Sequence, residues 1–220
     1  MKIVEQSVKV LRPTSTEAAI EGLKLVEYAG RNCYRSHDKI DEESYQDFIE
    51  RVLLKRGHSS PLEFEDMTVE IVTSRDVMAE ITRHRHVSFA IQSQRYVVDD
   101  KTGDISFIKP DFYVPKEDLS LDAKKWCASR KWEESMANEE LDYKYMKHDC
   151  SMPAQDARKV LGNSVATVIV MKANLREWLH IFALRNSPAA YPEMQTMIKM
   201  IVEKFNELYP GLYKGAPDEQ

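Results

Sequence analysis

The sequence lacks the glycine-rich loops that commonly bind phosphate groups. It has only 7 glycines in 220 residues and contains neither GxGxxG nor GxxxxGK[ST]. Such loops bind phosphates through backbone N–H groups, often at the start of a helix. A nucleotide or dinucleotide bound by this chain must therefore be held mainly by side chains.

Cysteine is also scarce, which excludes two further kinds of site. Cys33, Cys127 and Cys150 are odd in number, widely separated and without a CxxC pair. A disulfide framework or a structural zinc site would need closely patterned pairs. His84 and His86 have no carboxylate or thiolate near them at ligand spacing, so we expect no metal site and reduced thiols.

Long apolar runs are missing as well. No segment of about 18 consecutive apolar residues occurs, so no membrane span is expected. The first residues, Met-Lys-Ile-Val-Glu, lack the apolar core of a signal peptide. The formal net charge of -5 argues against a general attraction to nucleic acid. We expect a cytoplasmic protein with neither a membrane nor nucleic acid as a partner.

One segment, from Arg83 to Tyr96, reverses this acidic balance locally. It holds three arginines, two histidines, two serines and two glutamines. Guanidinium groups beside hydroxyl donors suit phosphate and carboxylate oxygens, so the segment predicts a local anion site. Two alternatives remain open: a solvated basic helix end, and an RNA-binding surface on which Phe89 and Tyr96 stack against bases.

The length and the 43% of hydrophobic residues fit one domain, residues 1–220. Apolar periodicity divides this domain into strands and helices. Strands are predicted at residues 1–11, 65–73, 105–108 and 167–171. The near-continuous apolar run of the last of these suggests burial.

Capping residues and helical periodicity predict the helices. They are expected at residues 16–28, 41–56, 75–85, 153–161, 174–185 and 192–208, and residues 120–147 are expected to form one long helix or a broken pair. If the third of these reaches Arg85, then Glu80, Arg83 and His84 are neighbours on one face and Arg85 points elsewhere. A Ser-His-Asp hydrolase built on Ser88 or Ser93 is conceivable, but there is no GxSxG elbow.

Arg83-His84-Arg85 is followed by seven residues, then Ser93, and then Arg95 two positions later. This spacing resembles the signature of the flavin-dependent thymidylate synthases. Three further matches follow the same order: Gly57-His58 with Pro61 and Glu63, Arg158, and Asn174-Leu175-Arg176 with Arg185. The resemblance covers residues 57–185. Conventional thymidylate synthases use a cysteine nucleophile, and no cysteine lies beside the basic segment in the sequence.

The resemblance implies an α+β single domain, with a mainly antiparallel sheet flanked by helices, that assembles as a homotetramer. Active sites would be shared between subunits, with Arg158 supplied by a neighbour. The implied reaction converts dUMP to dTMP without an enzyme nucleophile. The carbon would come from 5,10-methylenetetrahydrofolate, and the hydride from FAD reduced by NADPH.

The resemblance also implies roles for individual residues. Arg185 would be catalytic, because a guanidinium beside the pyrimidine favours negative charge developing on the ring. The residues implied for FAD are His58, Ser60, Arg83, His84, Arg85, Ile91, Asn174, Arg176 and His180. Those implied for dUMP are Glu80, Arg83, Gln92, Ser93, Gln94, Arg95, Arg158 and Arg185.

The sequence departs from the family pattern at several of its positions. Glu80 stands where glutamine is frequent, Ala90-Ile91 where Asn-Glu is frequent, Gly162 where proline is common and His180 where asparagine is common. A family member that binds flavin but cannot methylate is therefore a further alternative.

Overall fold

The computed structural model describes residues 1–96, 103–117 and 122–215 of the chain. The chain divides into two compact units. Unit 1 comprises Met1–Ser7, Ile71–Thr82 and Ala90–Ile169, and unit 2 comprises Val8–Glu70, Arg83–Phe89 and Val170–Gln220. All of these divisions except the one after Thr82 fall inside the strands of one sheet, so the strands contribute residues to both units.

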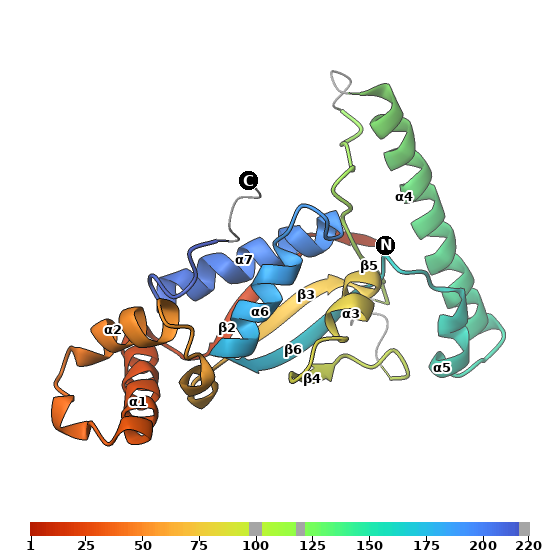
Figure 1. Ribbon diagram of the computed structural model, residues 1–220. Helices are drawn as coiled ribbons and strands as arrows, with labels where there is room; N and C mark the ends of the chain where they lie inside the picture. Colours follow the sequence, from red (N-terminus) through yellow and green to blue (C-terminus); the bar gives the residue numbers. More distant parts are fainter. Residues whose placement is uncertain (97–102, 118–121, 216–220) are drawn as a thin grey trace. The chain divides into compact units, whose positions relative to one another are not determined.

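That sheet has four strands in the order β2 (Ser7–Arg12), β3 (Asp66–Ser74), β6 (Ala166–Asn174) and β4 (Ser88–Ile91). Figure 1 shows the two long strands β3 and β6 next to each other. The expected fold class, helices with a mainly antiparallel sheet, is confirmed.

Burial alternates along both long strands. Met67, Val69 and Ile71 of β3 are fully buried, as are Ile169 and Met171 of β6. The intervening residues of β6 are partly or fully exposed. The predicted strand at residues 167–171 is confirmed, and its burial holds for one face: Thr167, Ile169 and Met171 are buried, whereas the side chains between them point to the opposite face and are partly exposed.

The first 11 residues form two strands rather than the single predicted one. β1 (Lys2–Val4) pairs in parallel with β5 (Ser106–Ile108), whereas β2 joins the four-stranded sheet. Gln6 lies at the break and is buried, and its Oε1 accepts a hydrogen bond from Thr73 Oγ1 at 2.7 Å. A buried amide must be hydrogen-bonded, and this bond fixes the place where the chain changes sheets.

Unit 1 contains the longest helix, α4 (Ala123–Lys144), which continues as a π-helical turn, Tyr145–Asp149. Met136 and Tyr143 of this helix pack on Ile105 and Phe107. Residues 120–147 were predicted to form one long helix or a broken pair, and the structure shows one helix from residue 123 onward; residues 120 and 121 lie outside the described part of the chain. The predicted helix at 153–161 is shorter, comprising α5 (Ala154–Ala157) and a 3₁₀ turn, Arg158–Val160.

The helix predicted at 75–85 is also shorter than expected. α3 (Arg75–Ile81) is followed by Thr82, whose hydroxyl donates to the carbonyl of Met78 at 2.9 Å. Residues 83–87 are not helical, and the next element is the unpredicted strand β4. The prediction that Glu80, Arg83 and His84 share a helix face is therefore wrong.

Unit 2 contains several helices and parts of the four strands. α1 (Thr16–Tyr34) begins at the N-cap Ser15 and runs six residues beyond the predicted end, to Arg35 in the left-handed conformation. α2 (Ser44–Phe48) continues as a π-helix, Ile49–Leu54, and Gly57 follows with φ of 71°. We call residues 44–54 the 44–54 helix. A 3₁₀ turn, Ser60–Phe64, leads into β3.

The last two helices of unit 2 agree with their predictions. α6 (Leu175–Arg185) is capped by Asn174, and α7 (Pro192–Leu208) begins with a proline in its first turn. They lie side by side in Figure 1. Trp178 and Phe182 of α6 pack with Phe205 and Tyr209 in an aromatic core. No helix among the described residues is long and apolar enough to cross a membrane.

Candidate active site

The centre of the candidate site in unit 2 is a contact between His84 and Arg185. His84 lies in the irregular segment after α3 and is only 7% exposed, and Arg185 ends α6. Arg185 Nε donates a hydrogen bond to His84 Nε2 at 2.9 Å. Because Nε2 accepts this bond, a neutral His84 carries its proton on Nδ1.

Burial lowers the pKa of His84 to about 4, and the positive charges of Arg185 and His180 add to the effect. His84 is therefore neutral near pH 7. It orients the guanidinium of Arg185 without cancelling its positive charge.

His180 lies beside this pair. Its ring meets that of His84 edge-on, with the centroids 6.4 Å apart. Burial raises the pKa of the neighbouring Glu177, whereas the charges of His180 and His86 lower it. The structure thus brings together His84, His180 and Arg185 of the predicted set.

A cavity of about 320 Å³ forms a second part of the site in unit 2, and we call it the His58 cavity. His58, Ser60 and Arg176, three residues implied for FAD, all line it. Its volume is at the lower end of the range for small-molecule sites, so it suits one end of a dinucleotide.

Close packing of helices forms the wall of this cavity. A Cβ atom on Gly30 of α1 would lie only 2.3 Å from Cζ of Phe48, so glycine is needed for this approach. Tyr34 also lines the cavity, and its hydroxyl lies 2.6 Å from Nδ1 of His58. The sequence patterns did not single out Tyr34.

Two residues implied for FAD also have structural partners. Arg176 Nη1 pairs with Glu63 Oε1 at 2.6 Å, and both side chains are exposed. Exposed pairs contribute little to stability, so Arg176 can exchange this partner for an anionic ligand. Asn174 Oδ1 caps α6 by accepting from the backbone N–H of Glu177 at 2.8 Å, which leaves the amide NH₂ of Asn174 for a ligand.

Most of the residues implied for dUMP lie in unit 1. The backbone N–H of Gln92 donates to the carbonyl of Val168 at 2.9 Å, which fixes the chain after β4. Ser93 to Tyr96 then form a turn in which Arg95 N–H donates to Ser93 Oγ at 3.3 Å. Ser93 and Arg95 are both exposed.

Arg158 lies near another arginine, Arg75, at the start of α3. Burial lowers the pKa of Arg75, and the charge of Arg158 adds to this. Neither guanidinium pairs with a carboxylate among the described residues, and Nε of Arg75 has no hydrogen-bond partner there. Two neighbouring cations without a carboxylate indicate an anion site. The sequence patterns identified Arg75 only as the first residue of a helix, since nothing local links it to Arg158.

The other predicted residues lie on α3, on β4 or in the segments that follow them. Arg83 and Arg85 are exposed, and Arg85 Nη1 donates to the carbonyl of His84 at 2.9 Å. Glu80 is partly exposed on α3, and Ile91 is exposed at the end of β4. Gln94 is partly buried, and its Nε2 has no hydrogen-bond partner among the described residues.

One departure from the family pattern has a structural reason. The backbone N–H of Gly162 donates to Glu139 Oε2 at 2.8 Å. A proline at this position has no N–H and could not form this bond.

The sequence was compared with known families and proteins. The family model described as "Thymidylate synthase complementing protein" matches residues 17–211. A probable flavin-dependent thymidylate synthase of Mycobacterium phage D29 is 33% identical over 208 residues, covering 89% of this chain and 84% of the relative. The flavin-dependent thymidylate synthase of Mycobacteroides abscessus is 32% identical over 209 residues, covering 87% and 78%.

Solved structures with the same fold include two bound to nucleotides. The UMP/dUMP methylase PolB from Streptomyces cacaoi, bound with 5-Br dUMP, superposes with a TM-score of 0.74 at 20% identity, over 94% of this chain and 93% of that one. Thymidylate Synthase X from Helicobacter pylori, with FAD and dUMP, gives a TM-score of 0.67 at 22% identity, over 95% and 99%.

The family match covers most of the chain, and the two sequence relatives agree with it over 84% and 78% of their own length. The spacing from Arg83 to Arg95 had pointed to the same family. The chain belongs to the thymidylate synthase complementing protein family, that of the flavin-dependent thymidylate synthases.

Proposed function

We propose that this chain, as one catalytic domain spanning residues 1–220, converts dUMP to dTMP with FAD as its cofactor. The pyrimidine ring loses a proton at C5 and gains a methylene group and a hydride. Methylenetetrahydrofolate supplies the methylene group, and NADPH supplies the reducing equivalents. The observation that carries this proposal is the buried, neutral His84 that holds the charged Arg185.

The residues around the His58 cavity fit FAD as a ligand. His58, Ser60 and Arg176 provide an imidazole, a hydroxyl and a guanidinium, which can bind a dinucleotide without a glycine-rich loop. Arg176 and Arg185 lie on one helix, about 14 Å apart along its axis at 1.5 Å per residue. The flavin, when bound, supplies the hydride. His58 and Ser60, with Arg176 of α6, would hold the dinucleotide.

The nucleotide would be held by its phosphate and by its ring. Ser93, Arg95 and the Arg75–Arg158 pair are the proposed phosphate ligands, because they offer hydroxyl and guanidinium donors. Arg185 would lie against the pyrimidine, where its charge stabilises the negative charge that develops on the ring. His84 positions Arg185 for this role.

The absorption spectrum of the purified protein with added FAD tests the ligand assignments. We expect a bound-flavin spectrum that shifts when dUMP is titrated in, with UMP titrated in parallel as a comparison. A protein that stays colourless would contradict the proposal and favour the RNA-binding alternative, which none of the comparisons supports.

The substitution Arg185→Ala tests the catalytic assignment. Flavin binding should persist, because the residues of the His58 cavity are unchanged, whereas dTMP formation should fall below detection. Lys159→Ala, an exposed change outside the proposed site, is the control and should retain full turnover. Turnover by Arg185→Ala at the wild-type rate would refute the role given to Arg185.

A further inference from the structure

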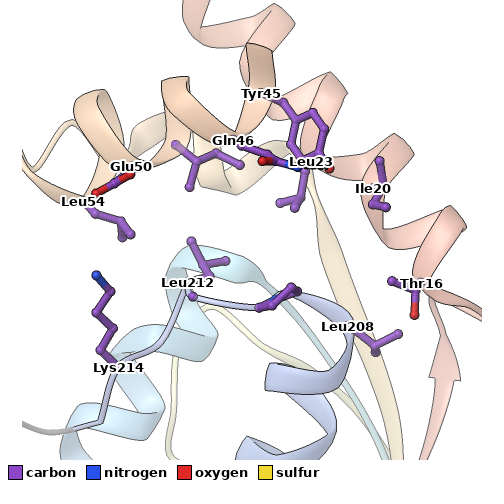
Figure 2. A pocket seen from close by; sticks show the side chains of 13 residues that line it. Thr16, Ile20, Leu23, Tyr45, Gln46, Glu50, Leu54, Leu208, Leu212 and Lys214 are labelled. Atoms are coloured by element: carbon purple, nitrogen blue, oxygen red, sulfur yellow. Dashed lines mark hydrogen bonds between the residues drawn. The ribbon is translucent and has the colours of Figure 1, made fainter. Parts of the chain in front are cut away.

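Another cavity in unit 2 lies away from the residues discussed so far. It has a volume of about 580 Å³ and is bounded by α1, the 44–54 helix and the segment after α7. Figure 2 shows side chains from these three segments facing the same space. It shares no lining residue with the His58 cavity. We call it the Leu23 cavity.

The lining of the Leu23 cavity is mainly aliphatic. Its apolar side chains are Ile20, Leu23, Ile49, Leu54, Leu208 and Leu212. Protein interiors are normally close-packed, with few voids larger than a water molecule. A space of this volume is instead typical of small-molecule sites, whose walls are mainly apolar with a few polar groups.

The polar groups of the lining are few, and some already have partners. Gln46 Nε2 donates to the hydroxyl of Tyr45 at 3.2 Å. Glu50, one of the two charged residues of the lining, pairs with Lys55 at 2.9 Å. The walls of the cavity are therefore mostly apolar and suit the apolar part of a ligand.

Lys214 is the other charged residue of the lining, and its side chain carries an ammonium group. Lys214 forms no salt bridge with any described residue, although its charge lowers the pKa of Glu50. Figure 2 shows its side chain extending toward Leu54 and Glu50. Because Glu50 is already paired with Lys55, Lys214 is the lining residue that offers an ammonium group to a ligand.

The 44–54 helix separates this cavity from the His58 cavity. Phe48 and Val52 line the His58 cavity, whereas Ile49, Glu50 and Leu54 line the Leu23 cavity. A ligand in one cavity therefore does not occupy the other.

We propose that the Leu23 cavity is a second binding site, for a small organic anion. The apolar body of the ligand, an aromatic ring system, would pack against the leucine and isoleucine side chains. Its single carboxylate would pair with the ammonium group of Lys214. This site is separate from the proposed FAD and dUMP sites and does not depend on their assignment.

Calorimetric titration of 1-naphthylacetate into the FAD-saturated protein tests this proposal. We expect saturable binding of one molecule per chain. The neutral 1-naphthaleneethanol should bind more weakly and the cationic 1-naphthylmethylammonium most weakly, because the charge of the head group is the main difference between the three. Absence of saturable binding, or tighter binding of the cation, would overturn the proposal.

Matched substitutions locate the binding site. Leu23→Trp fills the cavity and should abolish binding, whereas Leu25→Trp, on the same helix at a position 48% exposed, should leave binding unchanged. If Leu23→Trp does not fold, Leu208→Trp fills the same space from α7. Binding that survives in the folded cavity-filling variant would place the ligand elsewhere and refute the proposal.

A second pair of substitutions tests the charge. Lys214→Gln should weaken binding of 1-naphthylacetate about twofold to fivefold, the range expected for an exposed ion pair, and leave the alcohol unaffected. Lys199→Gln, at an exposed position on α7, should change neither. Equal binding of the anion by wild type and Lys214→Gln would contradict the assigned contact.

Discussion

At the scale of single residues, the site depends on a histidine that stays neutral. Burial and two neighbouring cationic side chains hold the pKa of His84 near 4, well below its ordinary value of 6.5. A protonated His84 could not accept the hydrogen bond from Arg185 Nε. The contact at 2.9 Å therefore exists only while His84 is neutral.

This low pKa predicts that stability depends on pH. The unfolded chain takes up a proton on His84 near pH 6.5, and the folded chain only near pH 4. Lowering the pH through this window therefore favours unfolding, by on the order of 2 kcal/mol. Urea denaturation at pH 7 and pH 4.5 measures the difference. The substitution His84→Gln should reduce this difference in stability between pH 7 and pH 4.5, whereas His148→Gln, at an exposed position, should leave it unchanged. Equal losses in all three proteins would contradict the assignment.

A second residue-scale prediction concerns Arg75. Arg75→Ala removes one of two unpaired cations from the proposed phosphate site, so dUMP affinity should fall about 10- to 100-fold, as expected when a charged hydrogen bond is lost. FAD affinity should not change. Nucleotide titration of the flavin spectrum measures both, with Lys159→Ala as the control. Unaltered dUMP affinity would remove Arg75 from the site.

The sequence alone predicted part of this candidate site. Arg83, Ser93 and Arg95 are close together in the chain, so their spacing is informative by itself. Arg75 and Arg158 come together only through folding, as do Tyr34 and His58. No local pattern records such long-range contacts.

At the scale of elements, two glycines determine how closely α1 approaches its neighbours. Gly22 and Gly30 are eight residues apart, so they lie on one face of the helix. A Cβ on Gly22 would lie 2.1 Å from the carboxyl carbon of Glu65, and one on Gly30 would meet the ring of Phe48. Burial raises the pKa of Glu65, whose Oε1 accepts from the Tyr209 hydroxyl at 2.8 Å.

Gly30→Ala should therefore destabilise the protein. Alanine normally stabilises a helix interior by about 1 kcal/mol relative to glycine. Here the clash with Phe48 should outweigh that gain and cost about 1–3 kcal/mol, as overpacking does. FAD affinity should fall too, since Gly30 and Phe48 both line the His58 cavity. A melting temperature that rises on substitution would show that α1 can move away from Phe48 at little cost.

The elements themselves were predictable where the signals are local. The N-cap Asn174 and the proline at the start of α7 marked two helices correctly. The end of α3 was mispredicted because the chain leaves the helix after Thr82, a boundary that the helical periodicity does not reveal. β4 was missed because its place beside β6 depends on a partner far away in the sequence.

At the scale of the whole molecule, the residues proposed for FAD and for dUMP are distributed differently over the two units. Most of the proposed nucleotide residues lie in unit 1, and most of the proposed FAD residues lie in unit 2. We further propose that the chain assembles as a homotetramer with Arg158 contributed by a neighbouring subunit, as the family resemblance implies.

Mixed oligomers test this sharing of sites. Arg158→Ala and Arg185→Ala should each be inactive alone. Co-expressed chains should regain roughly a quarter of wild-type turnover if the two arginines of a site come from different subunits that assemble at random. Co-expressed chains that are purified through two different tags and show no recovery would place both arginines on one chain.

The most direct test of the central claim is the product itself. FAD-loaded protein would be incubated with dUMP, NADPH and methylenetetrahydrofolate carrying carbon-13 in its methylene group, and the nucleotide analysed by NMR. We predict dTMP with the label in its methyl group, formed only when FAD is present. A folded, flavin-loaded protein that forms no labelled dTMP would contradict the proposed function.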